Sequence, residues 1–378
     1  MPAGPTRTLR VAVAAAAIVV TLGPSAGASQ ARRPASSAAK PPVTAYVVLQ
    51  HSLVPINVAT GAPGAAIPYK GDTIRQLLAT PNGSKLYGQD GFGVIPFSTV
   101  TQTAQPRMNF SRVQDIAITP NGRKLFVGAG ALRVFAVPTA TDKPGKPIRI
   151  GSNAVAIAIT PNGRTVYTAG NFRAGRATPV SVATGRAGRV VKVGRFPDDI
   201  AITPNGKTVY VANFDSGTVT PISAATNRPG KPIKVNGDPV QIVITPNGKT
   251  AYVLGGPPFG DGVVTPINIK TGRPGRGIKV GESPFPIAVT PNGKTVYVAN
   301  TFSGTVTPIS TATNKAGHAI AVPGDPGSIA FTPNGKFAFI GDNQAGQVTP
   351  IKIATNTAGP PITVAPAGSI VGDIVILP

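Results

Sequence analysis

Oxygen-bearing side chains recur at one position of a repeated phrase, and they are the residues of this chain best suited to chemistry. Asp115, Asp199 and Asp373 each open a short β-branched run such as "DIAIT". Gln76 and Gln241 stand at the same place in two other copies. Carboxylate and amide oxygens arranged around an axis suit a hard cation such as Ca²⁺. With two loop residues expected on the same side, the candidate acidic mouth comprises Gln76, Asp115, Asp199, Gln241, Asp373, His51 and Glu282.

Other catalytic arrangements are missing from the sequence. No G-x-S-x-G motif occurs, and the two histidines, His51 and His318, belong to distant repeats, so a His-based metal pair is excluded. The absence of cysteine excludes a disulfide framework and thiol catalysis. Because the mouth residues recur with the repeat, they are also what a scaffold alone would produce. We expect no organic cofactor. Ca²⁺ is the ion that the acidic mouth would suit, and the sequence leaves open whether any metal binds there.

Basic residues form a second recurring set. They follow the glycine of a repeated Asn-Gly turn in six units, at Arg123, Arg164, Lys207, Lys249, Lys294 and Lys336. Lysine in an exposed turn also serves solubility and discourages strand pairing at edges. A ring of six such residues favours an anion-binding surface.

The elements that position both sets follow from the phrase T-P-N-G and its close variants. It begins at Thr80, Thr119, Thr160, Thr203, Thr245, Thr290 and Thr332, in steps of 39, 41, 43, 42, 45 and 42 residues. A period near 40 with strand-like content indicates propeller blades. One unit predicts strand A at 199–203, strand B at 208–213, strand C at 218–223 and strand D at 231–235.

The two ends of the chain supply one further blade. "DIVILP", at 373–378, repeats strand A, while "TAYVVL" at 44–49 and "VPIN" at 54–57 match strands B and C. A C-terminal strand A beside N-terminal strands B–D closes the ring and removes its open edges. The fold expected is an all-β single propeller of four-stranded blades, eight by this count, with seven as the alternative.

Proline in strand C is the feature that fits this scheme least well. Because proline lacks the ladder donor, it usually argues against a central strand. We therefore expect a bulge or an interrupted ladder at each such position. These prolines are Pro55, Pro96, Pro179, Pro221, Pro266, Pro308 and Pro350, with Ala136 at the matching place in one unit.

"TVYVAN" and "SGTVTPISTATN" resemble the YVTN family of β-propeller repeats, found in secreted and surface-layer proteins of bacteria and archaea. The resemblance spans the mature domain and implies a propeller, but no particular activity. Asn-Gly replaces the family's usual Asp-Gly, and "PIS" replaces "VID", so acid is lost from one side. A more distant similarity to lactonase-like propellers implies an alternative, a hydrolase or lyase that works at the axial mouth with a divalent cation.

The net charge indicates the kind of partner, and the N-terminal residues indicate export. The chain has 36 basic and 13 acidic residues, a net charge of +23, which points to anionic polymers or acidic partners. By loop, 12 acids fall on one face, with Asp142 the exception on the other. Residues 1–28 have a basic, apolar and small-residue order typical of a cleaved signal peptide, 29–42 form an expected disordered linker, and 43–378 the propeller.

The expected function is therefore an exported, noncatalytic binding scaffold at the cell envelope. Its partner would be an anionic cell-wall polymer or an envelope protein, held through the basic face. We expect no specific nucleic-acid binding, no transmembrane segment in the mature chain, and a monomer. The competing interpretation remains the lactonase-like enzyme.

Overall fold

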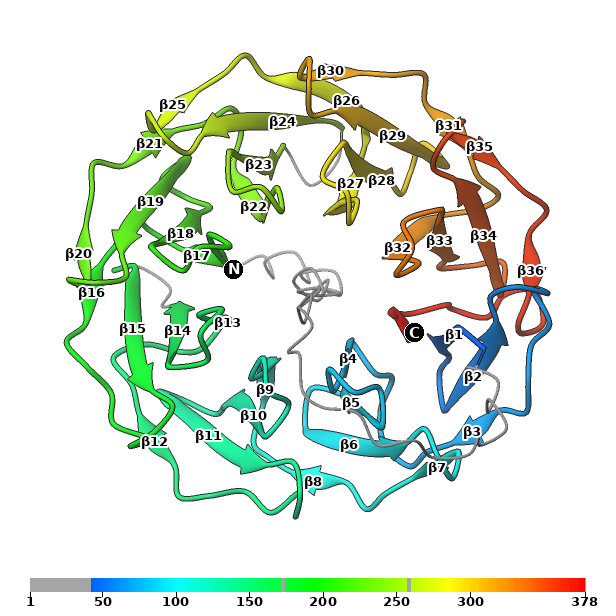
Figure 1. Cartoon of the computed structure of the whole chain (residues 1–378), viewed down its shortest axis with the longest axis horizontal. Coiled ribbons are helices and arrows are strands. Elements are labelled where there is room, and N and C mark those ends of the chain that lie inside the picture. The colour runs from blue at the N-terminus through cyan, green and yellow to red at the C-terminus, as the bar shows by residue number, and fades with distance from the viewer. Residues whose placement is uncertain (1–41, 171–173, 257–259, 378) are drawn as a thin grey trace, which may run out of the picture.

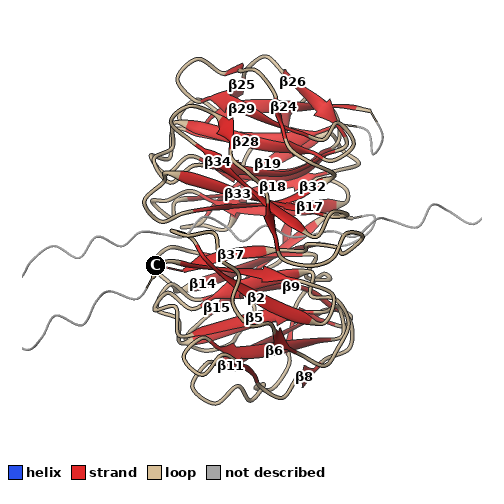
Figure 2. Cartoon of the chain, turned by 90° about the vertical axis from the view of Figure 1, so that its right-hand side faces the viewer, coloured by secondary structure: helices blue, strands red, loops and turns tan. Residues whose placement is uncertain are grey.

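The computed structural model describes residues 42–170, 174–256 and 260–377. Eight antiparallel sheets stand around a central axis, so the protein is an eight-bladed β-propeller (Figure 1). Seen from the side, the strands run between two faces on which the turns and loops lie (Figure 2). The predicted signal peptide and nearly all of the predicted linker lie outside the described residues. None of the described residues forms a helix long and apolar enough to cross a membrane.

Strands A lie innermost in Figure 1. In blades I to VIII they are β37 (Ile374–Leu377), β4 (Gln76–Ala79), β9 (Val113–Ile118), β13 (Ala156–Ile159), β17 (Pro197–Ile202), β22 (Pro239–Ile244), β27 (Pro284–Val289) and β32 (Pro326–Phe331). Strands B follow outward as β1 (Thr44–Val48), β5 (Lys85–Gln89), β10 (Lys124–Ala129), β14 (Thr165–Gly170), β18 (Thr208–Asn213), β23 (Thr250–Gly255), β28 (Thr295–Asn300) and β33 (Phe337–Asp342). Strands C come next as β2 (Ser52–Asn57), β6 (Gly93–Ser98), β11 (Arg133–Pro138), β15 (Arg176–Ser181), β19 (Thr218–Ser223), β24 (Asp261–Asn268), β29 (Thr305–Ser310) and β34 (Gln347–Lys352).

The outermost strand D is short in every blade. Three blades have one segment, namely β3 (Ile67–Pro68), β12 (Ile148–Arg149) and β16 (Val191–Lys192). Five have two, namely β7 (Thr103–Ala104) and β8 (Met108–Asn109), β20 (Arg228–Pro229) and β21 (Ile233–Lys234), β25 (Arg273–Pro274) and β26 (Ile278–Glu282), β30 (Lys315–Ala316) and β31 (Ile320–Ala321), and β35 (Thr357–Ala358) and β36 (Ile362–Thr363).

Strand D is interrupted opposite the strand-C prolines, and likewise opposite Ala136 in blade III, whose carbonyl accepts from the Gly145 amide at 3.0 Å. Pro221 lies opposite Tyr210 of strand B with no register shift, so the B–C ladder continues past it. On the outer side its carbonyl accepts a hydrogen bond from the Gly230 amide at 2.8 Å, but its nitrogen has no proton to return. Strand D pairs with strand C only on either side of the proline. The predicted interruption of the ladder is confirmed, and it falls between strands C and D.

The predicted closure of the ring is confirmed. Strand β37 from the C-terminus pairs with β1 from the N-terminus, with Tyr46 opposite Val375. The ladder continues for one more residue, because the Val48 amide donates to the Asp373 carbonyl at 3.0 Å. Blade I is therefore built from both ends of the chain.

The hydrophobic core lies between blades. Each of eight buried clusters draws its residues from two neighbouring sheets, as where Tyr167 and Ala169 of β14 join Val209 and Val211 of β18. The C-terminal strand β37, which closes the ring by pairing with β1 and which we call the clasp, joins two of these clusters. Leu377 packs in the cluster between blades I and II, and Ile374 packs in the cluster between blades VIII and I. Stability of the ring therefore depends on blade-to-blade contact at every junction.

Candidate functional site

Each T-P-N-G turn is a hydrogen-bonded unit, and six of the seven project a basic side chain. In blade V the Thr203 hydroxyl donates to Asn205 Oδ1 at 2.7 Å and accepts from the Thr208 amide at 3.0 Å. Asn205 Oδ1 also accepts from the backbone amide of Lys207 at 3.0 Å. Only the glycine takes positive φ, 69° at Gly206. The lysine side chain takes no part in the turn.

Neighbouring turns stack on one another around the axis. A Cβ added to Gly122 would lie 2.8 Å from Pro81 Cδ of the preceding blade, and one added to Gly293 would lie 3.0 Å from Pro246 Cδ. Glycine is required at these two positions by both its φ and its neighbour. The A–B turns of blades II to VIII thus follow one another around one face, which we call the turn face. Its six predicted basic side chains are all exposed: Arg123, Arg164, Lys207, Lys249, Lys294 and Lys336.

The single acid predicted on the turn face is already paired. Asp142, in the C–D turn of blade III, forms an ion pair with Lys85 Nζ at 2.6 Å. Its other oxygen accepts a hydrogen bond from the Tyr87 hydroxyl at 2.6 Å. No described residue forms an ion pair with any of the six basic side chains of the ring. The turn face therefore presents positive charge without a local counter-ion from the protein.

The Asp142 contact is one case of a tie between blades that the sequence analysis missed. A strand-B tyrosine reaches the C–D turn of the next blade at a residue with positive φ. Tyr167 donates to Asn227 and Tyr252 donates to Asn314, both at 2.6 Å. Tyr297 donates to Asn356 in the same way, and Gln102 donates to the Tyr46 hydroxyl at 2.8 Å. These pairs fix the C–D turns beside the A–B ring.

The predicted mouth residues on strand A form a second series of ties, close to the axis. Each accepts a hydrogen bond from a strand-A backbone amide in the following blade. The pairs are Asp373 with Leu77 at 2.9 Å, Gln76 with Ile116 at 3.0 Å, Asp115 with Ile157, Asp199 with Ile242 at 2.8 Å, and Gln241 with Ile287 at 3.0 Å. We call these five contacts the axial clips. They account for the recurrence of oxygen-bearing side chains at this position.

Burial changes the proton affinity of two clips. Asp115 and Asp373 are both buried, and this desolvation raises the pKa of each carboxyl group to about 7, although backbone amide donors oppose the shift. Neutral Gln76 and Gln241 hold the same contact in other blades. A neutral side chain is therefore compatible with the position.

We expect the stability contribution of these two clips to fall as pH rises. Because their folded pKa of about 7 exceeds the unfolded value of 3.8, the contribution is complete below pH 4 and lost between pH 4 and 7. Replacing both by asparagine (D115N/D373N) removes this pH dependence. The free energy of unfolding of the variant, relative to that of wild type, should therefore be higher at pH 8 than at pH 5 by an amount on the order of a few kcal/mol.

Melting curves measured from pH 5 to 8 check this expectation. The exposed Asp215→Asn variant is the control and should track wild type throughout. Parallel curves for D115N/D373N and wild type would contradict buried, proton-linked clips.

The remaining mouth residues lie elsewhere. His51 is exposed in the turn between β1 and β2 of blade I, where its ring centroid lies 6.4 Å from that of Tyr69. Glu282 is the last residue of β26, the outermost strand of blade VI, and its amide donates to Ser303 Oγ at 2.8 Å. The structure thus brings together the five strand-A residues but not His51 and Glu282. Among the described residues, no three His, Asp or Glu side chains gather as a metal site would require.

Comparison with known proteins supports the fold alone. No model of a known protein family matches the chain, and no curated protein matches its sequence. Among solved structures, dihydro-heme d1 dehydrogenase NirN in complex with DHE is similar at a TM-score of 0.76 and 14% identity, over 92% of this chain and 77% of that one. AztD from Citrobacter koseri is similar at a TM-score of 0.69 and 11% identity, over 89% of this chain and 98% of that one. Kuenenia stuttgartiensis hydrazine synthase is similar at a TM-score of 0.58 and 20% identity, over 74% of this chain and 95% of that one.

Proposed function

We propose that this protein is an exported, noncatalytic propeller of the YVTN type that binds an anionic polymer of the cell envelope through its turn face. The observation that carries the proposal is the ring of six exposed basic side chains, together with the pairing of the one acid on that face to Lys85 and Tyr87. The proposal of export is based on the signal-like order of residues 1–28.

The geometry favours a polymer over a single small anion. The basic residues are spread around the axis, one in each of blades III to VIII, and each is exposed to solvent. An exposed ion pair contributes about 0–1 kcal/mol, so no single contact holds a ligand firmly. A chain of anions can engage several sites together, and linked contacts raise the overall affinity well above that of each one.

The alternative, a lactonase-like enzyme with a cation at the mouth, has less support from the described geometry. Both carboxylate oxygens of Asp115 accept backbone amide protons, and so do both of Asp373. A cation would have to displace contacts that join one blade to the next. NirN and hydrazine synthase are named for reactions, but identities of 14% and 20% carry none of that chemistry to this chain.

Salt dependence of binding tests the proposal. The full chain should be retained on immobilised poly(glycerol phosphate), a phosphate polymer of the cell-wall type. Because the Debye length falls from about 10 Å at 0.1 M salt to about 3 Å at 1 M, the affinity should fall by about tenfold or more over this range. Any one substitution, such as Lys249→Ala, should change it by less than about threefold.

Two outcomes would count against the proposal. One is the lack of retention at low salt, and the other is retention that salt does not change. The second result would indicate a shape-specific site, for which the mouth is the better location.

A further inference from the structure

The side of the molecule that holds most acids carries a basic sector of its own. Residues 116–197, which begin just after the buried Asp115 of β9 and end just before Asp198 and Asp199 of β17, contain 13 basic residues and one acid, Asp142, which lies on the turn face and is already paired. Some of the basic residues, such as Arg123 and Arg164, belong to the turn face, whereas Arg133, Arg149, Arg176, Lys192 and Arg195 lie toward the B–C side of blades III and IV and the loop into β17. The exposed acids of the B–C side lie in other blades, at Asp72, Asp215, Asp238, Asp261 and Glu282. Charge on this side therefore varies around the ring.

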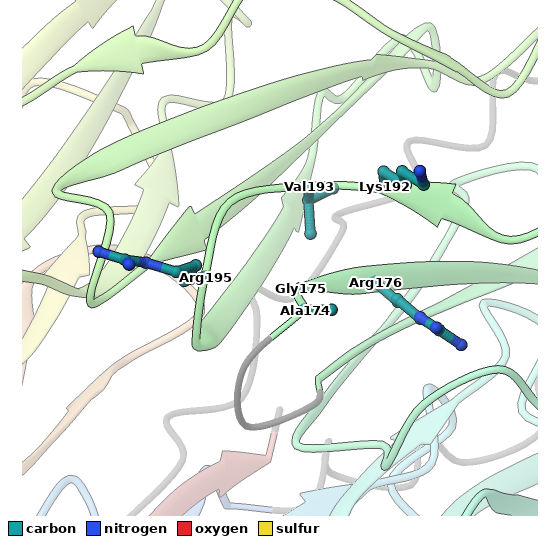
Figure 3. A pocket seen from close by; sticks show the side chains of 6 residues that line it. All are labelled: Ala174, Gly175, Arg176, Lys192, Val193 and Arg195. Atoms are coloured by element: carbon teal, nitrogen blue, oxygen red, sulfur yellow. The ribbon is translucent and has the colours of Figure 1, made fainter.

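Three basic residues of this sector meet in a recess at the outer rim. A groove of about 340 Å³ is lined by Ala174, Gly175, Arg176, Lys192, Val193 and Arg195. Figure 3 shows Val193 and Ala174 between Arg195 on one side and Arg176 with Lys192 on the other. The three basic side chains are exposed. We call this recess the rim groove.

Hydrogen bonds of the main chain hold the groove in shape. The Val193 amide donates to the Gly175 carbonyl at 3.0 Å, which joins its two edges. The Arg195 amide donates to Ser216 Oγ of blade V at 2.6 Å, which fixes the far wall. Neither contact uses a basic side-chain nitrogen.

The strand register places like charges directly opposite one another. At the start of strand C and its partner on strand D, Arg133 lies opposite Arg149 in blade III, and Arg176 lies opposite Lys192 in blade IV. Like charges at such positions are destabilising. Blade VI has an acidic pair of this kind, Asp261 opposite Glu282. No other described blade places two basic residues opposite each other, since the equivalent pairs are Ser52–Pro68, Gly93–Asn109, Thr218–Lys234, Val263–Lys279, Thr305–Ala321 and Gln347–Thr363.

The two charged pairs are continuous across the blade boundary. Arg176 Nη1 donates to the carbonyl of Gly151, two residues beyond Arg149, at 3.2 Å. No described residue forms an ion pair with any basic residue of these pairs or of the groove. The rim therefore presents a row of cations over two blades whose mutual repulsion an anion would relieve.

We propose that the outer rim of blades III and IV binds a linear polyanion, with one anionic group in the rim groove and the chain passing over Arg133 and Arg149. Arginine matches this role because its planar guanidinium presents paired donors to phosphate or carboxylate oxygens. This site lies on the opposite side from the turn face and does not depend on the function proposed above.

A matched pair of variants tests the proposal. Arg133→Thr/Arg176→Thr gives blades III and IV the residue that blade V has at Thr218, and removes two charges. The control, Lys234→Thr/Lys279→Thr, removes two charges at the equivalent strand-D positions of blades V and VI. The probes are long-chain polyphosphate and polyglutamate, which separate phosphate from carboxylate recognition.

The expected result is a loss of affinity of about tenfold or more in the groove variant for at least one polymer, and of less than about threefold in the control. With the turn face disabled by Lys207→Glu/Lys249→Glu/Lys294→Glu, that polymer should still raise the melting temperature of the otherwise unchanged protein and of the control, but not of the groove variant, since a ligand that binds the native state stabilises it. Equal losses in the two variants, or binding of neither polymer, would overturn the proposal. A turn-face variant, Lys207→Glu/Lys249→Glu/Lys294→Glu, should keep groove binding, so failure at one site is distinguishable from failure at the other.

Discussion

Deleting residues 372–378 should destabilise the whole ring in one cooperative step and lower its melting temperature by at least about 10 °C. The deletion removes β37, the inner strand of blade I, and leaves β1 with an unpaired edge. It also removes Ile374 and Leu377 from two inter-blade clusters. The axial clip from Asp373 to Leu77 is lost with them.

The control for this experiment is Ile370→Ala, since Ile370 is 46% exposed just before the clasp and its variant should melt like wild type. Should the truncated chain fail to purify folded, adding the missing segment as a peptide should restore a cooperative transition. A truncated chain that melts like the intact one would contradict closure by the clasp.

Reversing three charges of the turn face should reduce binding to poly(glycerol phosphate) by about 100-fold or more at low salt. The variant is Lys207→Glu/Lys249→Glu/Lys294→Glu, which converts three attractive contacts into repulsive ones. The fold should be unchanged, because each turn uses the backbone amide of the lysine and not its side chain. Circular dichroism and melting temperature check that point.

A variant with the same change in net charge separates a surface from overall charge. Lys70→Glu/Lys234→Glu/Lys279→Glu changes three exposed lysines outside the turn face and should lose less than about fivefold. Equal losses in the two triple variants would mean that net charge alone drives binding.

The strands and turns of the fold were predictable because the sequence pattern of each one recurs in several repeats. The expected strands at 208–213 and 218–223 coincide with β18 and β19. Strand D was predicted as one piece at 231–235, but β20 and β21 lie on either side of the position opposite Pro221. The proline predicted the interruption, but it did not indicate which of its two ladders would break.

The role of the mouth residues could not be read from residue type. A carboxylate at the start of strand A can bind a cation or accept a hydrogen bond from a backbone amide. The partner of Asp115 is the amide of Ile157, which lies in the next blade, so the repeat pattern within one blade does not reveal it. Glu282 was grouped with the mouth by its loop, but the loop begins at the outer rim.

A signal for the tyrosine ties was present within the chain. Where the C–D turn has asparagine, as at Asn227 and Asn314, the strand-B residue of the preceding blade is tyrosine. Where the turn has Gly61 or Gly185, the corresponding strand-B residue is Phe339 or Phe126. Tyr210, which corresponds to Gly272, departs from the rule. Comparing the aromatic position with the turn of the next repeat would have found most of these contacts.

The central claim, that the turn face binds an anionic polymer, is tested most directly by the reactivity of individual lysines. Acylation of the protein with and without poly(glycerol phosphate), followed by mass spectrometry, reports which amines the polymer covers. The account predicts that Lys207, Lys249, Lys294 and Lys336 lose reactivity on binding while Lys234 and Lys279, on the outer strands of blades V and VI, keep theirs. Protection of Lys234 and Lys279 with the four turn lysines left reactive would contradict it.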